Sequence, residues 1–241
     1  MTSSIDGRTV LVTGANGGLG TEFVRQALDR GARTVYAAAR TPRQWDDSRV
    51  RTLALDITDQ ASVDAAVSAA SDVDLLINNA AIAPAGDIIS GPEQELRRIF
   101  ETNFFGTLRV ANAFAPILGA NGGGTVLNIL SAASWINIPT GYAASKAAAW
   151  SATKSLGVVL APQGTQVIGL QVGMIDTAMT IQYDVQKATV ESVVAQAYDG
   201  VSAGLVEILA DDSTREVKAR LSSPAEEFYP WLDEQLAGLL T

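Results

Sequence analysis

The sequence predicts a doubly wound α/β fold, in which helices cover both faces of a parallel sheet. Short apolar runs alternate with longer stretches that have helical spacing or strong helix formers. A glycine-rich turn follows the first apolar run and opens the first helical stretch. The 241 residues contain neither an internal repeat nor a low-complexity linker, so we expect a single domain.

Six apolar runs are expected to form the strands, because runs of this length bounded by turn residues are typical of strands in a parallel sheet. They are Thr9–Thr13, Thr34–Ala39, Val50–Leu55, Asp74–Asn78, Thr125–Leu130 and Gln166–Val172.

Four stretches between these runs are predicted to be helices. They are Leu19–Arg30, Asp59–Ser71, Glu93–Leu118 and Tyr142–Leu160. Thr58 or Asp59 is the expected N-cap of the second one, because a hydroxyl or carboxylate there accepts from free backbone N–H groups.

The chain after Asp176 gives weaker signals. Residues 178–199 have no firm period, and residues 210–223 are charged and irregular. Pro224–Leu240 is predicted to form an amphipathic C-terminal helix with a buried stripe. That stripe consists of Phe228, Trp231, Leu232, Leu236 and Leu239.

Charge and composition exclude several classes of function. The net charge is −9, so the chain has no general attraction to nucleic acid or to anionic membranes, and neither is expected as a partner. No apolar stretch is long enough to cross a membrane, and residues 1–8 lack the pattern of a secretory signal, so we expect a cytoplasmic protein. The absence of Cys and His excludes thiolate catalysis and Ser–His–Asp triads, and no metal site is predicted.

The glycine-rich turn after the first strand is a candidate phosphate site. Glycines let the backbone approach a pyrophosphate closely, and the following helix supplies free N–H groups and the positive end of its dipole. Because Gly17 and Gly18 are adjacent, both Gly14-x3-Gly18-x-Gly20 and Gly14-x2-Gly17-x2-Gly20 fit. The turn alone does not decide between these two spacings.

Tyr142 and Lys146 form a candidate acid–base pair. Residues at i and i+4 share one helical face, with Cβ atoms about 5–6 Å apart. An ammonium beside a phenol favours the phenolate and is expected to lower the pKa of Tyr142 from about 10. The pair follows a predicted strand and Ser131, at the sheet edge where such folds bind ligands. Tyr142 is therefore a credible general acid in a chain without His.

Together these motifs resemble the compact branch of the short-chain dehydrogenase/reductase family. The resemblance covers about three quarters of the chain and favours the first glycine spacing. It implies a Rossmann-type fold, with residues 1–241 as one NAD(P)-binding domain and a substrate loop at about 176–200. The motifs that carry it are Thr13-Gly14-x3-Gly18-x-Gly20, Asn78-Asn79-Ala80-Ala81, Asn103, Asn128-Ile129-Leu130-Ser131, Tyr142-x3-Lys146 and Asp176-Thr177.

The resemblance also implies the role of each site residue. Tyr142 would deliver a proton to the substrate oxygen, and Ser131 would donate a hydrogen bond to it. Lys146 would lower the pKa of Tyr142 and bind the nicotinamide ribose, and Asn103 would hold a water that links Lys146 to solvent. The implied cofactor contacts are Gly14, Asn16, Gly17, Gly18, Leu19, Gly20, Arg40, Asp56, Ile57, Asn79, Ala80, Ala81, Tyr142, Lys146, Gly173, Ile175 and Thr177.

Three features depart from the family pattern. Ser131 precedes Tyr142 by 11 residues, fewer than usual, and Ser134 is a competing candidate that leaves too little chain, so Ser131 is favoured. Val172-Gly173 stands where the family usually has Pro-Gly. The usual glycine-rich C-terminal strand motif is absent, so the sequence predicts neither a seventh strand nor the tetramer contacts that this strand makes.

The end of the second predicted strand indicates the cofactor. A carboxylate there would bind a ribose 2′-hydroxyl, but Ala39 is followed by Arg40, whose guanidinium suits a 2′-phosphate. We therefore expect NADP(H) rather than NAD(H). Many NADP-preferring relatives carry a second basic residue where this chain has Gly17, and Arg43 is either a further contact or a solvated surface residue.

The residues expected around the substrate are mostly apolar and include no basic anchor. They predict an uncharged, hydrophobic ketone, aldehyde or secondary alcohol as substrate for hydride transfer with NADP(H). The alternative function is that of a non-catalytic NADP(H)-binding sensor of the same fold. Among the residues of the pocket, Trp135 could equally belong to the core. The residues are Ala81, Ile82, Ala83, Trp135, Ile136, Met174, Ile175, Met179 and Tyr183.

A homodimer or homotetramer is expected. Charged residues make up only 18% of the chain and apolar ones 47%, which favours surface that is buried between subunits. The resemblance implies that Glu93–Leu118 and Tyr142–Leu160 pair with their copies across a two-fold axis.

Overall fold

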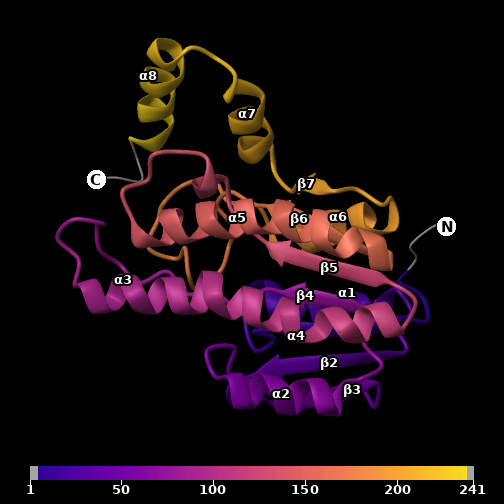
Figure 1. The fold of residues 1–241 in the computed structure, drawn as a ribbon. Coiled ribbons are helices and arrows are strands. Elements are labelled where there is room, and N and C mark those ends of the chain that lie inside the picture. The colour runs from indigo at the N-terminus through magenta and orange to yellow at the C-terminus, as the bar shows by residue number, and fades with distance from the viewer. Residues whose placement is uncertain (1–4, 238–241) are drawn as a thin grey trace.

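The protein, described over residues 5–237 by a computed structural model, is built on one parallel sheet of seven strands (Figure 1). The strand order is β3-β2-β1-β4-β5-β6-β7, so the order reverses between β1 and β4, where α/β folds bind ligands. The strands are β1 (Thr9–Thr13), β2 (Thr34–Ala39), β3 (Val50–Ala54), β4 (Leu75–Asn78), β5 (Gly124–Ile129), β6 (Thr165–Gln171) and β7 (Glu207–Leu209).

Helices cover both faces of the sheet. The side chains of α1 and α6 pack with one face, and those of α2, α4 and α5 with the other. The helices are α1 (Gly18–Asp29), α2 (Gln60–Ala69), α3 (Glu93–Phe100), α4 (Thr107–Ala120), α5 (Gly141–Leu160), α6 (Val190–Ser202), α7 (Asp212–Arg220) and α8 (Ala225–Leu236). The short helical turns are η1 (Glu101–Gly106), η2 (Ala132–Ser134) and η3 (Ala161–Gln163).

The predicted fold class is confirmed. All six expected strands and all four expected helical stretches are present, with ends that differ by one or two residues. The stretch expected over Glu93–Leu118 is continuous from α3 to α4, with a π-helical turn at η1. Asp59 is the N-cap of α2, where its carboxylate accepts from Ala61 N and Ser62 N, both at 3.2 Å.

The region after Asp176 is more regular than expected. Residues 190–202 form α6, whose buried face includes Val194 and Tyr198, and the Tyr198 hydroxyl donates to Phe23 O at 2.6 Å. A seventh strand, β7, pairs with the end of β6. The charged segment that was expected to be irregular contains α7, because Asp211 caps its first turn.

The predicted C-terminal helix is present as α8, and it lies beyond the β7 end of the molecule together with α7 (Figure 1). Phe228, Leu232 and Leu236 are buried against Ile136 and Ile138 in the segment that leads from β5 to α5. The end of the predicted stripe, including Leu239, lies outside the described residues. Within residues 5–237, none of the helices is long and apolar enough to span a membrane.

Candidate active site

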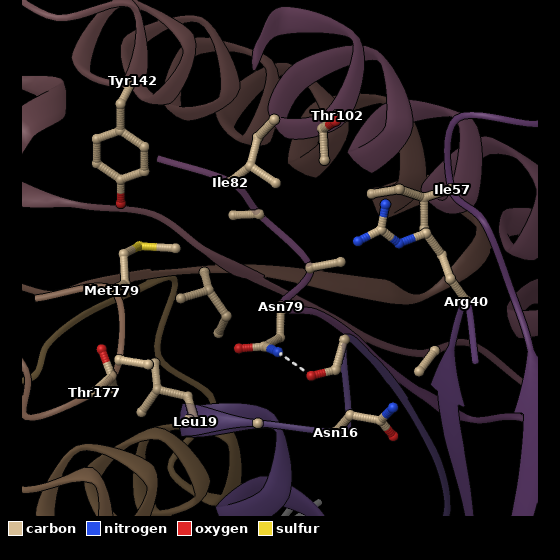
Figure 2. A pocket seen from close by; sticks show the side chains of 18 of the residues that line it. Asn16, Leu19, Arg40, Ile57, Asn79, Ile82, Thr102, Tyr142, Thr177 and Met179 are labelled. Atoms are coloured by element: carbon tan, nitrogen blue, oxygen red, sulfur yellow. Dashed lines mark hydrogen bonds between the residues drawn. The ribbon is translucent and has the colours of Figure 1, made fainter. Parts of the chain in front are cut away.

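A cleft of about 710 Å³ lies at the carboxyl ends of the central strands (Figure 2). Every cofactor contact implied by the sequence lines this cleft except Gly20, which lies behind the glycine turn. Figure 2 shows Tyr142 at one side of the cleft and Arg40 at the opposite side. The structure therefore brings together residues from position 14 to position 177 of the chain.

The glycine turn needs glycine at three positions. Gly14 has a φ of +67° and Gly18 of +49°, in the left-handed region that residues with a Cβ rarely adopt. A Cβ on Gly20 would lie 2.1 Å from Gly14 O, whereas a Cβ on Gly17 would meet no atom within 4 Å. The backbone therefore requires the spacing Gly14-x3-Gly18-x-Gly20.

Two asparagines fix the turn in place. Asn79 at the end of β4 donates through Nδ2 to Thr13 O at 2.9 Å and to Gly14 O at 3.2 Å. Asn16 donates to Thr41 O at 2.7 Å, which joins the turn to the segment after β2. The turn is therefore held on both sides before any ligand binds.

The electrostatics of the cleft suit a phosphate-bearing ligand. No side chain caps the N-terminus of α1 and no acidic residue lies in its first turn, so its backbone N–H groups can face an anion. Arg40 is exposed at the cleft wall, whereas the Arg43 guanidinium lies 4.0 Å from the centre of the Trp45 ring and does not line the cleft. The structure thus gives Arg43 a surface position.

Asp56 lines the same part of the cleft as Arg40. Its carboxylate accepts from Thr58 Oγ1 at 2.7 Å and from Thr58 N at 2.9 Å. These hydrogen bonds, and the charges of Arg40 and Arg109 more weakly, lower the pKa of Asp56, so the group is ionised at neutral pH.

Ser131 and Tyr142 meet at the other end of the cleft. Thr140 caps the first turn of α5 through a 3.2 Å bond from Ala143 N, and this helix start brings the Tyr142 phenol to the end of β5. The Ser131 side chain lies close enough to the Tyr142 hydroxyl to influence the pKa of the phenol. Ser134 Oγ is buried and has no hydrogen-bond partner among the described residues. The geometry therefore favours Ser131 over Ser134.

Burial controls the pKa values of the Tyr–Lys pair. It raises the pKa of the Tyr142 phenol, and the neighbouring Ser131 side chain opposes this rise. It also lowers the pKa of Lys146 to about 8. The Lys146 ammonium donates to Ile129 O at 2.7 Å and lies 5.7 Å from the centre of the Tyr142 ring. The expected lowering of the Tyr142 pKa by Lys146 is not found in this structure, because desolvation by burial has the largest influence on the phenol and raises its pKa.

Asn103 lies in η1 and is 1% exposed. Its Nδ2 donates to Ile82 O at 2.9 Å and to Ser145 Oγ at 3.1 Å, and its Oδ1 accepts from Ile82 N at 2.9 Å. The side chain joins the segment after β4 to α5, and both of its Nδ2 hydrogens are already donated. The water-binding role implied for Asn103 stays a prediction.

Only part of the expected substrate pocket lines the cleft, namely Ala81, Ile82, Ile175 and Met179. Ile136 packs against α8 instead. Trp135 is half-buried and packs edge-on against Trp150, with ring centres 6.3 Å apart, and it is not among the residues that line the cleft. Ala83, Met174 and Tyr183 are not among the lining residues.

Sequence reasoning missed Arg98 and Thr102, which line the cleft from α3 and η1. Their i, i+4 spacing indicates a shared helical face, but no sequence signal places that face at the cleft. Arg98 pairs with Glu95 at 2.8 Å and brings a basic group to a wall that was expected to have none.

Comparison with known proteins agrees with this geometry. The family model of short chain dehydrogenases matches residues 8–188. The sorbitol dehydrogenase of Cereibacter sphaeroides is 34% identical over 187 residues, which cover 71% of this chain and 72% of that protein. The galactitol 2-dehydrogenase of Agrobacterium fabrum is 31% identical over 184 residues, with 71% and 72% covered.

The solved structures agree as well. A short chain dehydrogenase from Burkholderia cenocepacia in complex with NADP superposes with a TM-score of 0.88 at 33% identity, covering 99% of this chain and 100% of that one. The NADPH-bound carbonyl reductase from chicken fatty liver superposes with a TM-score of 0.76 at 27% identity, covering 82% and 92%. The chain therefore belongs to the short-chain dehydrogenase family of oxidoreductases.

Proposed function

We propose that this protein transfers a hydride between NADP(H) and a carbonyl or secondary-alcohol substrate. The observation that carries the proposal is that Tyr142 and Lys146 line one end of a cleft, with Ser131 close to the Tyr142 hydroxyl, while the glycine turn and Arg40 line the rest of it. The glycine turn fits a dinucleotide, because Gly14, Gly17 and Gly18 line the cleft without side chains and the start of α1 has no side-chain cap.

The residues around the cofactor have separate tasks in this proposal. The backbone of the glycine turn would bind the pyrophosphate, and Lys146 would bind the nicotinamide ribose. NADP(H), when bound, supplies or accepts the hydride. Thr177 would contact the carboxamide, and Asp56 the exocyclic amine of adenine.

Tyr142 and Ser131 would act on the substrate oxygen. Because burial raises the pKa of Tyr142, the phenol keeps its proton at neutral pH and can donate it during carbonyl reduction. The Ser131 hydroxyl, which lies close to that of Tyr142, would donate to the same oxygen as it gains negative charge. With a pKa of about 8, Lys146 is still mostly protonated at pH 7 and stabilises a phenolate as it forms.

Arg40 supports NADP(H) as the preferred cofactor. β2 ends in three alanines, so no carboxylate there would repel a 2′-phosphate, and the guanidinium lies at the cleft wall. The Burkholderia relative, solved with NADP, supports the same choice. Dissociation constants for NADPH and NADH test this preference directly, and tighter binding of NADH would refute it.

The apolar part of the cleft wall supports an uncharged, hydrophobic ketone or aldehyde as substrate, and the basic group on that wall, Arg98, is already paired with Glu95. Ile82, Ile175 and Met179 contribute apolar surface beside Tyr142. The segment after Ile175 would serve as the substrate loop, and hydrogen bonds Asp176 N to Ala188 O (3.0 Å) and Ala188 N to Met174 O (2.8 Å) close its base. A panel of ketones, aldehydes and alcohols, assayed by nicotinamide absorbance with both cofactors, tests the reaction and the substrate class together.

We also propose that the protein forms a homodimer or homotetramer. Phe105 on η1 is 50% exposed, and Val158 and Val159 on α5 are 77% and 70% exposed. Apolar side chains this exposed on the two long helical stretches favour a subunit interface. Nothing observed among the described residues of the site favours the non-catalytic sensor, because Tyr142 and Lys146 both line the cleft and Ser131 lies close to the Tyr142 hydroxyl.

A further inference from the structure

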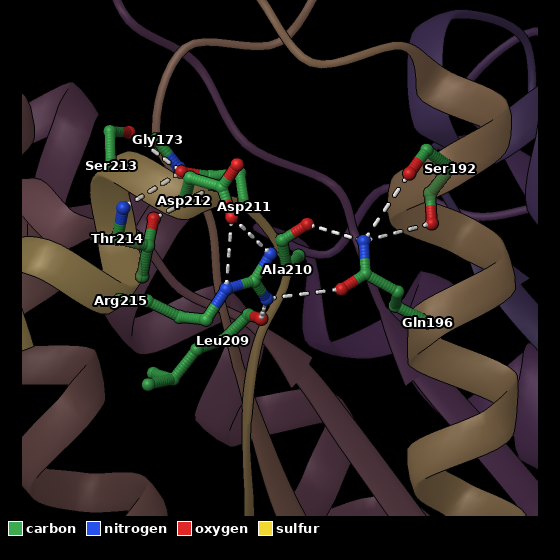
Figure 3. Close-up of polar contacts among 10 residues, drawn as sticks. All are labelled: Gly173, Ser192, Gln196, Leu209, Ala210, Asp211, Asp212, Ser213, Thr214 and Arg215. Atoms are coloured by element: carbon green, nitrogen blue, oxygen red, sulfur yellow. Dashed lines mark hydrogen bonds and ion pairs between the residues drawn. The ribbon is translucent and has the colours of Figure 1, made fainter.

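Asp211, which follows β7, carries a buried carboxylate that accepts four hydrogen bonds (Figure 3). The residue is 9% exposed and forms the N-cap of α7. Three of the bonds come from the start of α7: Ser213 Oγ at 2.6 Å, Thr214 N at 2.8 Å and Thr214 Oγ1 at 2.9 Å. The fourth comes from Gly173 N at 2.7 Å, 38 residues earlier in the chain. Capping of α7 explains the first three bonds but not the fourth.

The peptide that joins Val172 to Gly173 is held at both ends. Its carbonyl accepts from Ala132 N at 2.9 Å, and Ala132 directly follows Ser131. Its N–H donates to Asp211 Oδ2. A Cβ on Gly173 would lie 2.5 Å from Ser213 Oγ, so the start of α7 packs directly on this peptide.

This peptide begins the loop that closes one side of the cleft. Val172, Gly173 and Ile175 line the cleft, as does Thr177 further along the loop. A Cβ on Gly18 would lie 3.4 Å from Thr177 Cγ2, so the loop runs from the sheet to the glycine turn. A change in the plane of the 172–173 peptide would therefore move the loop residues that line this side of the cleft.

The sequence leaves the conformation of this peptide without a covalent restraint. Valine at position 172 places no ring restraint on the backbone next to this peptide, whereas a proline there would fix φ of residue 172. The Gly173 N–H is partly buried, and Asp211 supplies its hydrogen-bond partner from the C-terminal part of the chain.

We propose that Asp211 is a positioning residue for the nicotinamide end of the cleft. Its carboxylate sets the plane of the 172–173 peptide and couples α7 to the loop over residues 172–177. This inference rests on the proposed function in one respect, namely that the ligand next to the loop is the nicotinamide ring. The hydrogen bond from Gly173 N to Asp211, which we call the clamp, does not depend on that function.

The variant Asp211→Asn separates the clamp from the helix cap. Asparagine is as good an N-cap as aspartate, but its side chain has a single acceptor oxygen. Gly173 N and Thr214 N bond to different oxygens of the Asp211 carboxylate, so in the variant one of these two N–H groups faces the amide NH2 group. Asp211→Ser is a second variant, because serine also caps a helix but is too short to reach Gly173 N. Asp212→Asn is the matched control, because it makes the same change at a fully exposed neighbour in the same helix turn.

Two measurements test the proposal. The first is amide hydrogen exchange at Gly173 in the free protein, where we expect Asp211→Asn and Asp211→Ser to exchange about tenfold faster than wild type, with Asp212→Asn unchanged. The second compares binding of NADPH with binding of 2′,5′-ADP, which lacks the nicotinamide. The Asp211 variants should weaken NADPH about tenfold and 2′,5′-ADP less than about twofold.

Each outcome has a definite meaning. Exchange at Gly173 that stays at the wild-type rate in both folded Asp211 variants overturns the clamp. Equal weakening of NADPH and 2′,5′-ADP overturns the positioning of the nicotinamide end and leaves a general structural role. If wild type binds neither ligand, the proposed function fails, and the nicotinamide role of Asp211 fails with it. If wild type binds both and the variants bind NADPH as tightly, only the inference about Asp211 fails.

Discussion

Replacing Lys146 by methionine should remove a pH dependence of stability that the buried ammonium creates. Burial lowers the Lys146 pKa from 10.5 to about 8 in the folded protein. Between these values the unfolded chain binds more protons than the folded one, so the unfolding free energy of wild type rises with pH. From pH 7 to pH 9.5 this rise amounts to about 2 kcal/mol, because each unit of pKa difference corresponds to about 1.4 kcal/mol.

Urea unfolding of the cofactor-free protein at several pH values in this range measures the effect. Wild type should gain the stability as pH rises, and Lys146→Met should not. Lys154→Met is the matched control, because it removes an exposed lysine from the same helix and leaves the buried ammonium in place. Equal pH slopes for wild type and Lys146→Met would refute a buried, destabilised charge at this position.

Three further changes test other parts of the site and surface. Arg40→Ala should weaken NADPH binding about tenfold and leave NADH binding within about twofold, as measured by cofactor fluorescence, because only the 2′-phosphate loses a charge-assisted bond. Gly20→Ala should abolish detectable dinucleotide binding in a calorimetric titration, because its Cβ would lie 2.1 Å from Gly14 O; retained affinity would show that the turn adapts. Val158→Asp should reduce the mass seen by light scattering from that of an oligomer to that of a monomer, and a monomeric wild type would contradict the proposed assembly.

Much of the fold could be predicted from the sequence because burial leaves a simple pattern in a parallel sheet. Strands such as β1 and β2 are buried along their whole length, so they read as continuous apolar runs. The three-residue strand β7 is too short to produce such a pattern, and α7 is charged on most of its surface. β7 depends on its pairing with β6, whereas α7 is stabilised by its own N-cap, Asp211.

The candidate site was predictable where its residues follow a fixed local spacing. Tyr142 and Lys146 lie one helical turn apart, and the glycines of the phosphate-binding turn lie within seven consecutive residues, from Gly14 to Gly20. The direction of the Tyr142 pKa was not predictable, because it depends on desolvation by the surrounding fold. The bond between Asp211 and Gly173 joins distant segments with no characteristic spacing, so no sequence pattern could indicate it.

The central chemical claim is that the Tyr142 phenol supplies the proton during carbonyl reduction. The most direct test measures NADPH oxidation by wild type and by Tyr142→Phe with an activated aryl ketone, and compares the NADPH dissociation constants of both proteins. We predict that Tyr142→Phe loses turnover by at least about a hundredfold and binds NADPH within about twofold of wild type. Turnover by Tyr142→Phe at the wild-type rate would contradict this role for the phenol.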